Sequence, residues 1–272
     1  MISELTKLAI KAAIEAGKNI LYIYKSADFE IEIKEDNTPL TKADKAAHKI
    51  ISTILQESKI PILSEEGKNI PYENRKYWDK LWIVDPIDGT KEFIKRNGEF
   101  TINIALIEKG IPIIGVVIAP ELGLIYFSEK NLGSYKSTVN FEFCKLEDIL
   151  SKARTLPLRN KIETFTVVTS RSHLSKETEA FVENLREKHG NIKLISMGSS
   201  LKLCIVAEGK ANCYPRFAPT MEWDTAAGHV ICKFAGCKLT DLETKQEMVY
   251  NRKELTNNWF IVQNSANHIN LI

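Results

Sequence analysis

Residues 82–90 read Trp82-Ile83-Val84-Asp85-Pro86-Ile87-Asp88-Gly89-Thr90, and the expected fold depends most on this stretch. Residues 81–84 form an apolar run of strand length, which predicts a buried β-strand that ends on Asp85. Pro86 fixes φ and removes a backbone donor, so we expect strand pairing to stop there. Gly89 permits a tight turn. Asp88 is therefore expected to return close to Asp85.

Two carboxylates held by a rigid turn can face one point in space. Such convergence away from water is unfavourable unless a cation compensates the charge, and Mg²⁺ is the natural choice because it prefers hard oxygen ligands. The alternative is that Asp85 and Asp88 only form a turn, since Asp, Pro and Gly are common turn residues.

Two further acidic segments favour the metal site. Glu65 and Glu66 follow a short predicted strand at residues 61–64, and Asp224 lies near the start of an apolar helix expected over residues 221–234. Asp224 could also serve only as a helix cap, although a helix N-terminus is a favourable place for a phosphate.

The spacing of the two aspartates bears on the reaction class. Phosphatases that form a phospho-aspartate need Asp-x-Asp, whereas this chain has Asp85-x-x-Asp88 with Pro86 directly after the first carboxylate. The spacing therefore favours direct attack by a metal-activated water.

The remaining pattern predicts two parts joined in one compact catalytic unit. In an α+β part over residues 1–150 we expect helices at 3–24 and 41–58, a short strand at 30–34 with a turn at 36–39, and an antiparallel meander of strands at 100–107, 112–119 and 122–127. Thr41 is a good N-cap, with Asp44 at the capping-box position. After a charged stretch at 136–161, taken as the boundary, an α/β part over residues 151–272 has expected strands at 164–169 and 192–195 and helices at 175–189, 199–208 and 221–234.

Composition excludes several classes of protein. The chain has 272 residues, of which 44% are hydrophobic and 26% charged, and a formal net charge of +2, so nothing suggests a nucleic-acid partner. Its five cysteines form no CxxC pair, which favours reduced, buried thiols in a cytoplasmic protein. We expect neither a secretory signal nor a transmembrane segment, because no apolar run approaches about 20 residues.

Three motifs carry a family resemblance. Ser64-Glu65-Glu66, Asp85-Pro86-Ile87-Asp88-Gly89-Thr90 and Glu222-Trp223-Asp224-Thr225-Ala226-Ala227-Gly228, in this order, resemble those of the inositol monophosphatase superfamily of lithium-sensitive, Mg²⁺-dependent phosphatases. The resemblance covers the chain from Lys7 to about Thr240, least well over 136–161. It implies a layered αβαβα sandwich of the inositol monophosphatase and fructose-1,6-bisphosphatase type.

Within that superfamily, four segments are most similar to bacterial 3′(2′),5′-bisphosphate nucleotidases: residues 91–100, 170–173, 198–202 and 214–220. This similarity implies hydrolysis of adenosine 3′,5′-bisphosphate (PAP) to AMP and phosphate, and a place in sulfur metabolism. Inositol monophosphate or a sugar bisphosphate is the alternative substrate. A non-catalytic cation-binding module is the more remote alternative. The similarity also allows peripheral association with the inner face of a membrane, and it does not set the oligomeric state.

The resemblance also implies residue roles. Glu65, Asp85 and the carbonyl of Ile87 would hold one Mg²⁺, and Asp85, Asp88 and Asp224 a second. The catalytic residues would be Asp44, Thr90 and Glu65, with the Asp44–Thr90 pair orienting the attacking water. For Asp44 the capping box is an alternative role. The residues that would contact the substrate are Glu65, Ile87, Asp88, Gly89, Thr90 and Asp224.

Candidates for further contacts with the nucleotide are Lys34, His173, Ser199, Lys202 and Arg216, each of which could instead be an ordinary surface or capping residue. The guanidinium of Arg216 suits bidentate binding of a phosphate. His229 is expected to be a packed core histidine, since Mg²⁺ prefers oxygen. Trp223 is expected to be a packing anchor that positions Asp224, and Trp82 to belong to the core of its strand.

Overall fold

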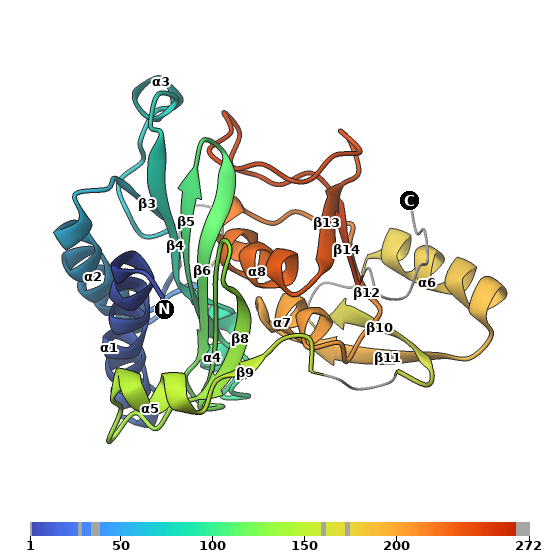
Figure 1. Ribbon diagram of the computed structural model, residues 1–272, viewed down its shortest axis with the longest axis horizontal. Helices are drawn as coiled ribbons and strands as arrows, with labels where there is room; N and C mark the ends of the chain where they lie inside the picture. The colour runs from blue at the N-terminus through green and yellow to red at the C-terminus, as the bar shows by residue number, and fades with distance from the viewer. Residues whose placement is uncertain (1, 27–28, 34–38, 159–161, 172–174, 265–272) are drawn as a thin grey trace.

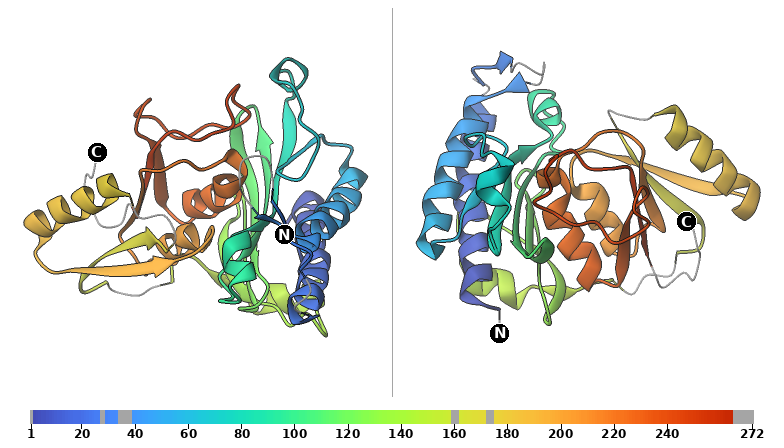
Figure 2. Two further views of the ribbon diagram at one scale, coloured as in Figure 1. Left: turned by 180° about the vertical axis from the view of Figure 1, so that it is seen from behind. Right: turned by 90° about the horizontal axis from the view of Figure 1, so that it is seen from above.

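The computed structural model describes residues 2–26, 29–33, 39–158, 162–171 and 175–264, and its elements are arranged in five layers (Figure 1). Two long helices, α1 (Glu4–Ser26) and α2 (Lys42–Leu55), pack together on one face of a seven-stranded sheet. Helices α7 (Leu201–Ala207) and α8 (Glu222–Phe234) lie between this sheet and a five-stranded sheet, and α6 (Lys176–His189) covers the far side. Figure 2 shows the layers from above. The expected αβαβα sandwich is confirmed.

The seven-stranded sheet contains the predicted meander. Its strands lie in sequence order, β3 next to β4 in parallel and every later neighbour antiparallel: β3 (Ile62–Ser64), β4 (Lys80–Asp88), β5 (Thr101–Glu108), β6 (Ile111–Ala119), β7 (Leu124–Glu129), β8 (Gly133–Thr138) and β9 (Arg154–Thr155). The last two strands and helix α5 (Leu146–Ser151) fall partly or wholly in the charged stretch at 136–161, where the sequence is less periodic. The first sheet therefore ends at Thr155, and the second begins at Phe165.

Strand β4 explains why the decisive stretch is apolar at nearly every position. Its side chains alternate between two cores: Trp82 and Val84 pack with α1 and α2, and Leu81 and Ile83 pack with α7 and α8. Because helices cover both faces of the sheet, neither set of side chains meets water. Trp82 is 0% exposed, as predicted for a core tryptophan.

The five-stranded sheet has the order β11-β10-β12-β14-β13. Strand β10 (Phe165–Ser170) runs parallel to β11 (Ile192–Met197) and to β12 (Cys213–Arg216), whereas β14 (Phe260–Asn264) is antiparallel to β12 and to β13 (Cys237–Asp241). The three strands β12 to β14 were not predicted, because they are short and lack clear alternation.

The smaller elements complete the chain: β1 (Glu32–Ile33) pairs with β2 (Pro39–Leu40), the 3₁₀ turn η1 spans Gln56–Ser58, and α3 (Tyr72–Arg75) and α4 (Thr90–Ile94) are short helices. All five cysteines are free thiols, four of them buried, as the sequence predicted. No helix in the described ranges combines the length and apolar character needed to cross a membrane.

Candidate active site

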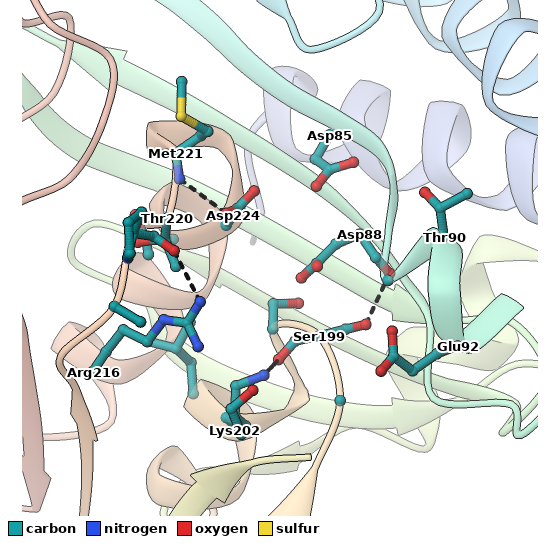
Figure 3. A pocket seen from close by; sticks show the side chains of 18 of the residues that line it. Asp85, Asp88, Thr90, Glu92, Ser199, Lys202, Arg216, Thr220, Met221 and Asp224 are labelled. Carbon is teal, nitrogen blue, oxygen red and sulfur yellow. Dashed lines mark hydrogen bonds between the residues drawn. The ribbon is translucent and has the colours of Figure 1, made fainter. Parts of the chain in front are cut away.

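Four of the acidic residues singled out in the sequence, Glu65, Asp85, Asp88 and Asp224, line one cavity of about 520 Å³ between the two halves of the fold. Glu65 follows β3, Asp85 and Asp88 lie on β4, and Asp224 lies in the first turn of α8. Strands β3 and β4 are parallel and Ser64 pairs with Val84, so both strands deliver their next residue to the same edge. Figure 3 shows Asp85, Asp88 and Asp224 facing this cavity from two different elements.

The sequence suggested that the strand ends at Asp85, and this prediction is wrong. Strand β4 continues to Asp88, and Pro86 instead breaks the register with β5: Asp85 pairs with Asn103, and the next pair is Asp88 with Thr101. The irregularity lets the carboxylate of Asp85 accept a hydrogen bond of 3.0 Å from the backbone N–H of Ile87. Both aspartates can therefore face the cavity, although they are three positions apart on a strand.

Gly89 is required by the turn that follows. Its φ is +90°, in the region that favours glycine, and helix α4 begins at the next residue, Thr90. A β-carbon at this position would also lie 2.2 Å from the Ser199 hydroxyl oxygen. The tight turn expected at Gly89 is confirmed.

The cavity disfavours negative charge on its own carboxylates. Burial raises the pKa of Asp85 well above its usual value, and Glu65, Asp88 and Asp224 raise it further. Burial raises the pKa of Asp88 to about 6, opposed by Lys202, and that of Asp224 to about 8, with Asp88 adding to the shift. Asp85 is only 1% exposed. Lys202 and Arg216 offset this only in part, because the pKa values of all three aspartates stay raised, so part of the negative charge of the ionised cluster is left uncompensated, and a bound cation would supply the missing positive charge.

The donor set suits a hard cation. Every acidic side chain of the cluster offers carboxylate oxygen, and neither histidine nor cysteine lines the cavity among the residues that the structure describes. As the side chains stand, no three of them in the described ranges surround a common point as metal ligands would. Asp224, for example, accepts a hydrogen bond of 2.9 Å from the backbone N–H of Met221 and thereby caps α8. The set fits Mg²⁺ by its chemistry and by its uncompensated charge.

Asp44 makes both contacts proposed for it. One carboxylate oxygen accepts the backbone N–H of Thr41 at 2.8 Å, which completes the capping box of α2. The other accepts the Thr90 hydroxyl at 3.3 Å, and this hydroxyl lies equally far from the carbonyl of Ile87. Asp44 is 2% exposed. A cap at the start of α2 thus fixes the carboxylate that reaches Thr90.

The opposite wall carries the positive charge. Lys202 and Arg216 line the cavity and are 7% and 8% exposed. Lys202 donates to the carbonyl of Ser199 at 2.6 Å, and burial lowers its pKa to about 8, opposed by Asp88. Arg216 donates to the carbonyl of Pro219 at 2.9 Å, whereas its buried Nε has no hydrogen-bond partner in the described part of the chain. Both cations are therefore placed to meet an anion in the cavity.

The other candidates divide into three groups. Ser199 lines the cavity, but its hydroxyl is directed at the carbonyls of Asp88 (2.8 Å) and Glu99 (2.7 Å). Lys34 and His173 lie outside the described residues. His229 is a core residue, as expected: it is 1% exposed, and its Nδ1 lies 3.0 Å from the hydroxyl of Tyr250. Trp223 is only partly buried, against the core between the sheets.

Sequence reasoning missed several residues of the site. Asn103 donates to Asp88 at 3.4 Å and accepts the Ser200 hydroxyl at 2.6 Å. Glu92, 6% exposed, lines the cavity beside Thr90, as Figure 3 shows. Asn103 lies in a mostly apolar predicted strand. Its amide side chain in that setting was the one feature of the sequence that could have indicated a role in the site.

Comparisons with known proteins agree with this geometry. The profile of the inositol monophosphatase family matches residues 1–271. The chain is 44% identical over 236 residues to the 3′(2′),5′-bisphosphate nucleotidase CysQ of Salmonella typhimurium, covering 86% of this chain and 89% of that one. CysQ of Escherichia coli K12 is 42% identical over the same shares. The crystal structure of CysQ from Bacteroides thetaiotaomicron superposes with a TM-score of 0.86 at 49% identity, covering 95% of this chain and 96% of that one. The chain belongs to the inositol monophosphatase family.

Proposed function

We propose that this protein is a Mg²⁺-dependent phosphatase that hydrolyses the 3′-phosphate of adenosine 3′,5′-bisphosphate, giving AMP and inorganic phosphate. The observation that carries the proposal is the cavity itself, in which Glu65, Asp85, Asp88 and Asp224 face Lys202 and Arg216. The acidic wall suits cations that bind the scissile phosphate, and the basic wall suits the second phosphate of a nucleotide. The named CysQ relatives support this substrate.

Glu65, Asp85 and the Ile87 carbonyl would hold one Mg²⁺, and Asp85, Asp88 and Asp224 a second. Bound there, the ions would supply a water of lowered pKa and neutralise the charge that develops on the leaving oxygen. Glu65 lines the cavity, whereas Glu66 does not, and this difference supports the first glutamate of the pair as the ligand.

The chain's own groups would orient the reactants. Thr90 donates its hydroxyl hydrogen toward Asp44, so its oxygen lone pairs are available to accept a hydrogen bond from the attacking water. The water oxygen forms a bond to phosphorus as the bond from phosphorus to the ribose 3′-oxygen breaks in line. One proton of the water is given up, and the ribose oxygen gains one as AMP leaves.

The second phosphate would be bound on the opposite wall. Arg216 offers a guanidinium with one unpaired N–H, and Lys202 offers an ammonium group held by the Ser199 carbonyl. An inositol monophosphate has no second phosphate to pair with these buried cations. Their presence therefore supports a bisphosphate substrate over the inositol alternative.

A comparison of phosphate release tests the proposal. PAP and inositol 1-phosphate should be supplied in parallel to the purified protein, with Mg²⁺, with Ca²⁺ and with Mg²⁺ plus Li⁺. We expect kcat/KM to favour PAP, activity to require Mg²⁺, and Li⁺ to inhibit. A preference for inositol 1-phosphate would transfer the assignment to the alternative substrate. Release from neither compound with Mg²⁺ would favour a cation-binding module without chemistry.

A further inference from the structure

Glu99 and Arg171 form an ion pair between the two sheets, next to residues that line the cavity, such as Ser170 and Gly198. Glu99 precedes β5 of the first sheet, and Arg171 follows β10 of the second. Arg171 donates from Nε at 2.8 Å and from a terminal nitrogen at 2.7 Å, one bond to each carboxylate oxygen of Glu99. This two-pronged geometry makes an ion pair directional as well as attractive. Neither side chain lines the cavity, so any effect on substrate must pass through other residues.

Glu99 also holds the turn that follows β11. Its carboxylate accepts the backbone N–H of Gly198 at 2.8 Å, and its backbone carbonyl accepts the hydroxyl of Ser199 at 2.7 Å. Arg171 holds the same segment from the other side, because it donates to the carbonyl of Ser196 at 2.9 Å. One carboxylate thus fastens the ends of both β10 and β11 to the first sheet.

The fit at this turn is close. A β-carbon on Gly198 would lie 2.8 Å from the carbonyl oxygen of Glu99, nearer than such atoms approach. Ser199 has a φ of +51°, a conformation that a residue with a side chain rarely adopts unless its surroundings impose it. The bonds that Gly198 and Ser199 donate to Glu99 help to hold this conformation, together with the bond from the Ser199 hydroxyl to the carbonyl of Asp88.

Two groups of the site depend on the turn. The Ser199 hydroxyl contacts the carbonyl of Asp88 at 2.8 Å, and the Ser199 carbonyl accepts the ammonium of Lys202 at 2.6 Å. A displacement of the turn would therefore move Lys202 directly. Asp88 would move less, because Asn103 and the β4–β5 pairing also hold it.

We propose that Glu99, clamped by Arg171, is a positioning residue that sets the affinity for the part of the substrate beyond the scissile phosphate. The proposal rests on the proposed function, in which Lys202 meets the second phosphate of the nucleotide. Loss of the clamp should therefore weaken nucleotide binding more than it slows the hydrolysis of a small phosphomonoester.

Three variants test the clamp: Glu99→Ala, Arg171→Met and, as the matched control, Glu183→Ala. Glu183 pairs with Arg186 on α6 at 2.8 Å, in an exposed ion pair in the same half of the chain as Arg171, and neither residue lines the cavity. Steady-state kinetics on PAP and on p-nitrophenyl phosphate would be combined with calorimetric titration of AMP and with thermal unfolding.

Glu99→Ala should raise KM for PAP and Kd for AMP by about tenfold, the factor for a lost charge-assisted hydrogen bond, with kcat within about twofold. Arg171→Met should have a smaller effect in the same direction, because Glu99 keeps its bond to Gly198.

The outcomes separate this proposal from the proposed function. If the wild-type protein does not hydrolyse PAP, the proposed function is wrong. The Kd values for AMP of the wild-type and Glu99→Ala proteins then still test the clamp. Equal KM and Kd in Glu99→Ala and Glu183→Ala would overturn the clamp. An equal fall in kcat on PAP and on p-nitrophenyl phosphate, together with a lower melting temperature, would also overturn the clamp. A purely structural ion pair would give that pattern. Should Glu99→Ala not fold, the same measurements on Arg171→Met decide.

Discussion

Asp85 is the residue at which the electrostatics of the site are most constrained. It is 1% exposed, and three other carboxylates raise its pKa in addition to the effect of burial. In protein without a bound metal, the folded state therefore disfavours the ionised form of this side chain, which dominates in the unfolded state at neutral pH. An uncharged side chain of the same shape removes this cost from the folded state. It is, however, a weaker metal ligand than a carboxylate.

We therefore expect Asp85→Asn to separate stability from activity. At pH 7 and without metal, the variant should unfold at the same temperature as wild type or higher, because asparagine avoids the cost of burying Asp85 as a charge or of protonating it on folding. Its Mg²⁺-dependent kcat/KM should fall by at least about a hundredfold. Thermal unfolding in a chelating buffer and phosphate release with Mg²⁺ measure the two effects. Turnover close to that of wild type would contradict the metal assignment.

The Asp44 side chain has two roles: it caps α2 and it contacts Thr90. Substitutions at the two neighbouring residues distinguish these roles. Thr41→Ala should remove the side-chain cap of α2 and lower the free energy of unfolding by about 1 kcal/mol. Its kcat should change little, because the backbone N–H at position 41 still holds the Asp44 carboxylate. Thr90→Val should leave stability near that of wild type but reduce kcat by about a hundredfold, because the hydroxyl between Asp44 and the attacking water is lost. Urea unfolding and steady-state kinetics on both proteins test this. Equal effects of the two variants on kcat would contradict separate roles.

At the scale of the element, α8 is the helix that joins the two sheets. It packs against α7 and against several strands of the first sheet, and its first turn presents Asp224 to the cavity. The close approach to α7 depends on Gly228. A β-carbon there would lie 2.6 Å from Cδ1 and 2.9 Å from Cβ of Leu203, a side chain that is 2% exposed and has no room to move.

Two glycine-to-alanine variants in helix interiors test that packing. Gly228→Ala should lower the free energy of unfolding by about 1–3 kcal/mol through overpacking, and should reduce activity because α8 carries Asp224. Gly17→Ala in α1 is the matched control: its closest contact is the partly buried ring of Phe141, which can rotate away, and alanine favours the helix by about 1 kcal/mol. Chemical unfolding of both proteins measures the difference. A Gly228→Ala protein as stable as Gly17→Ala would show that α7 and α8 are loosely packed.

At the scale of the whole molecule, a buried carboxylate links the two halves away from the site. Glu208 follows α7 and is 0% exposed. It accepts the Tyr126 hydroxyl at 2.5 Å and the Lys136 ammonium at 2.7 Å, both from the first sheet, and it pairs with Lys210 at 2.7 Å. Burial raises its pKa, but the hydrogen bonds from Lys136 and Tyr126 and the ion pair with Lys210 outweigh burial and lower the pKa below the usual value.

Because the folded-state pKa is lowered, the stabilisation from Glu208 is present above the unfolded value of about 4.3 and is lost as the pH falls through the folded value. Glu208→Gln should lower the free energy of unfolding at pH 7 by about 3 kcal/mol, since Lys136 loses a charged partner. The difference from wild type should shrink as the pH falls below about 4. Unfolding at several pH values, with Glu183→Gln as the exposed control, tests this. A difference independent of pH would contradict the ion pair as its source.

Local features could be read from the sequence because neighbouring residues produce them. The apolar run of β4, the cap of α2 at Thr41 and the turn at Gly89 each depend on chain geometry within a few positions, and the structure contains all three. The carboxylates could be grouped for the same reason, because each follows a recognisable strand or opens a helix. Contacts between distant segments left no such pattern. Glu99 meets Arg171 across 72 positions, Tyr126 meets Glu208 across 82, and strands β12 to β14 pair although their sequences hardly alternate. Those partners are brought together by the packing of two sheets around α7 and α8. At Glu208, which is 0% exposed, burial also makes an unpaired charge costly enough to require its distant counterparts.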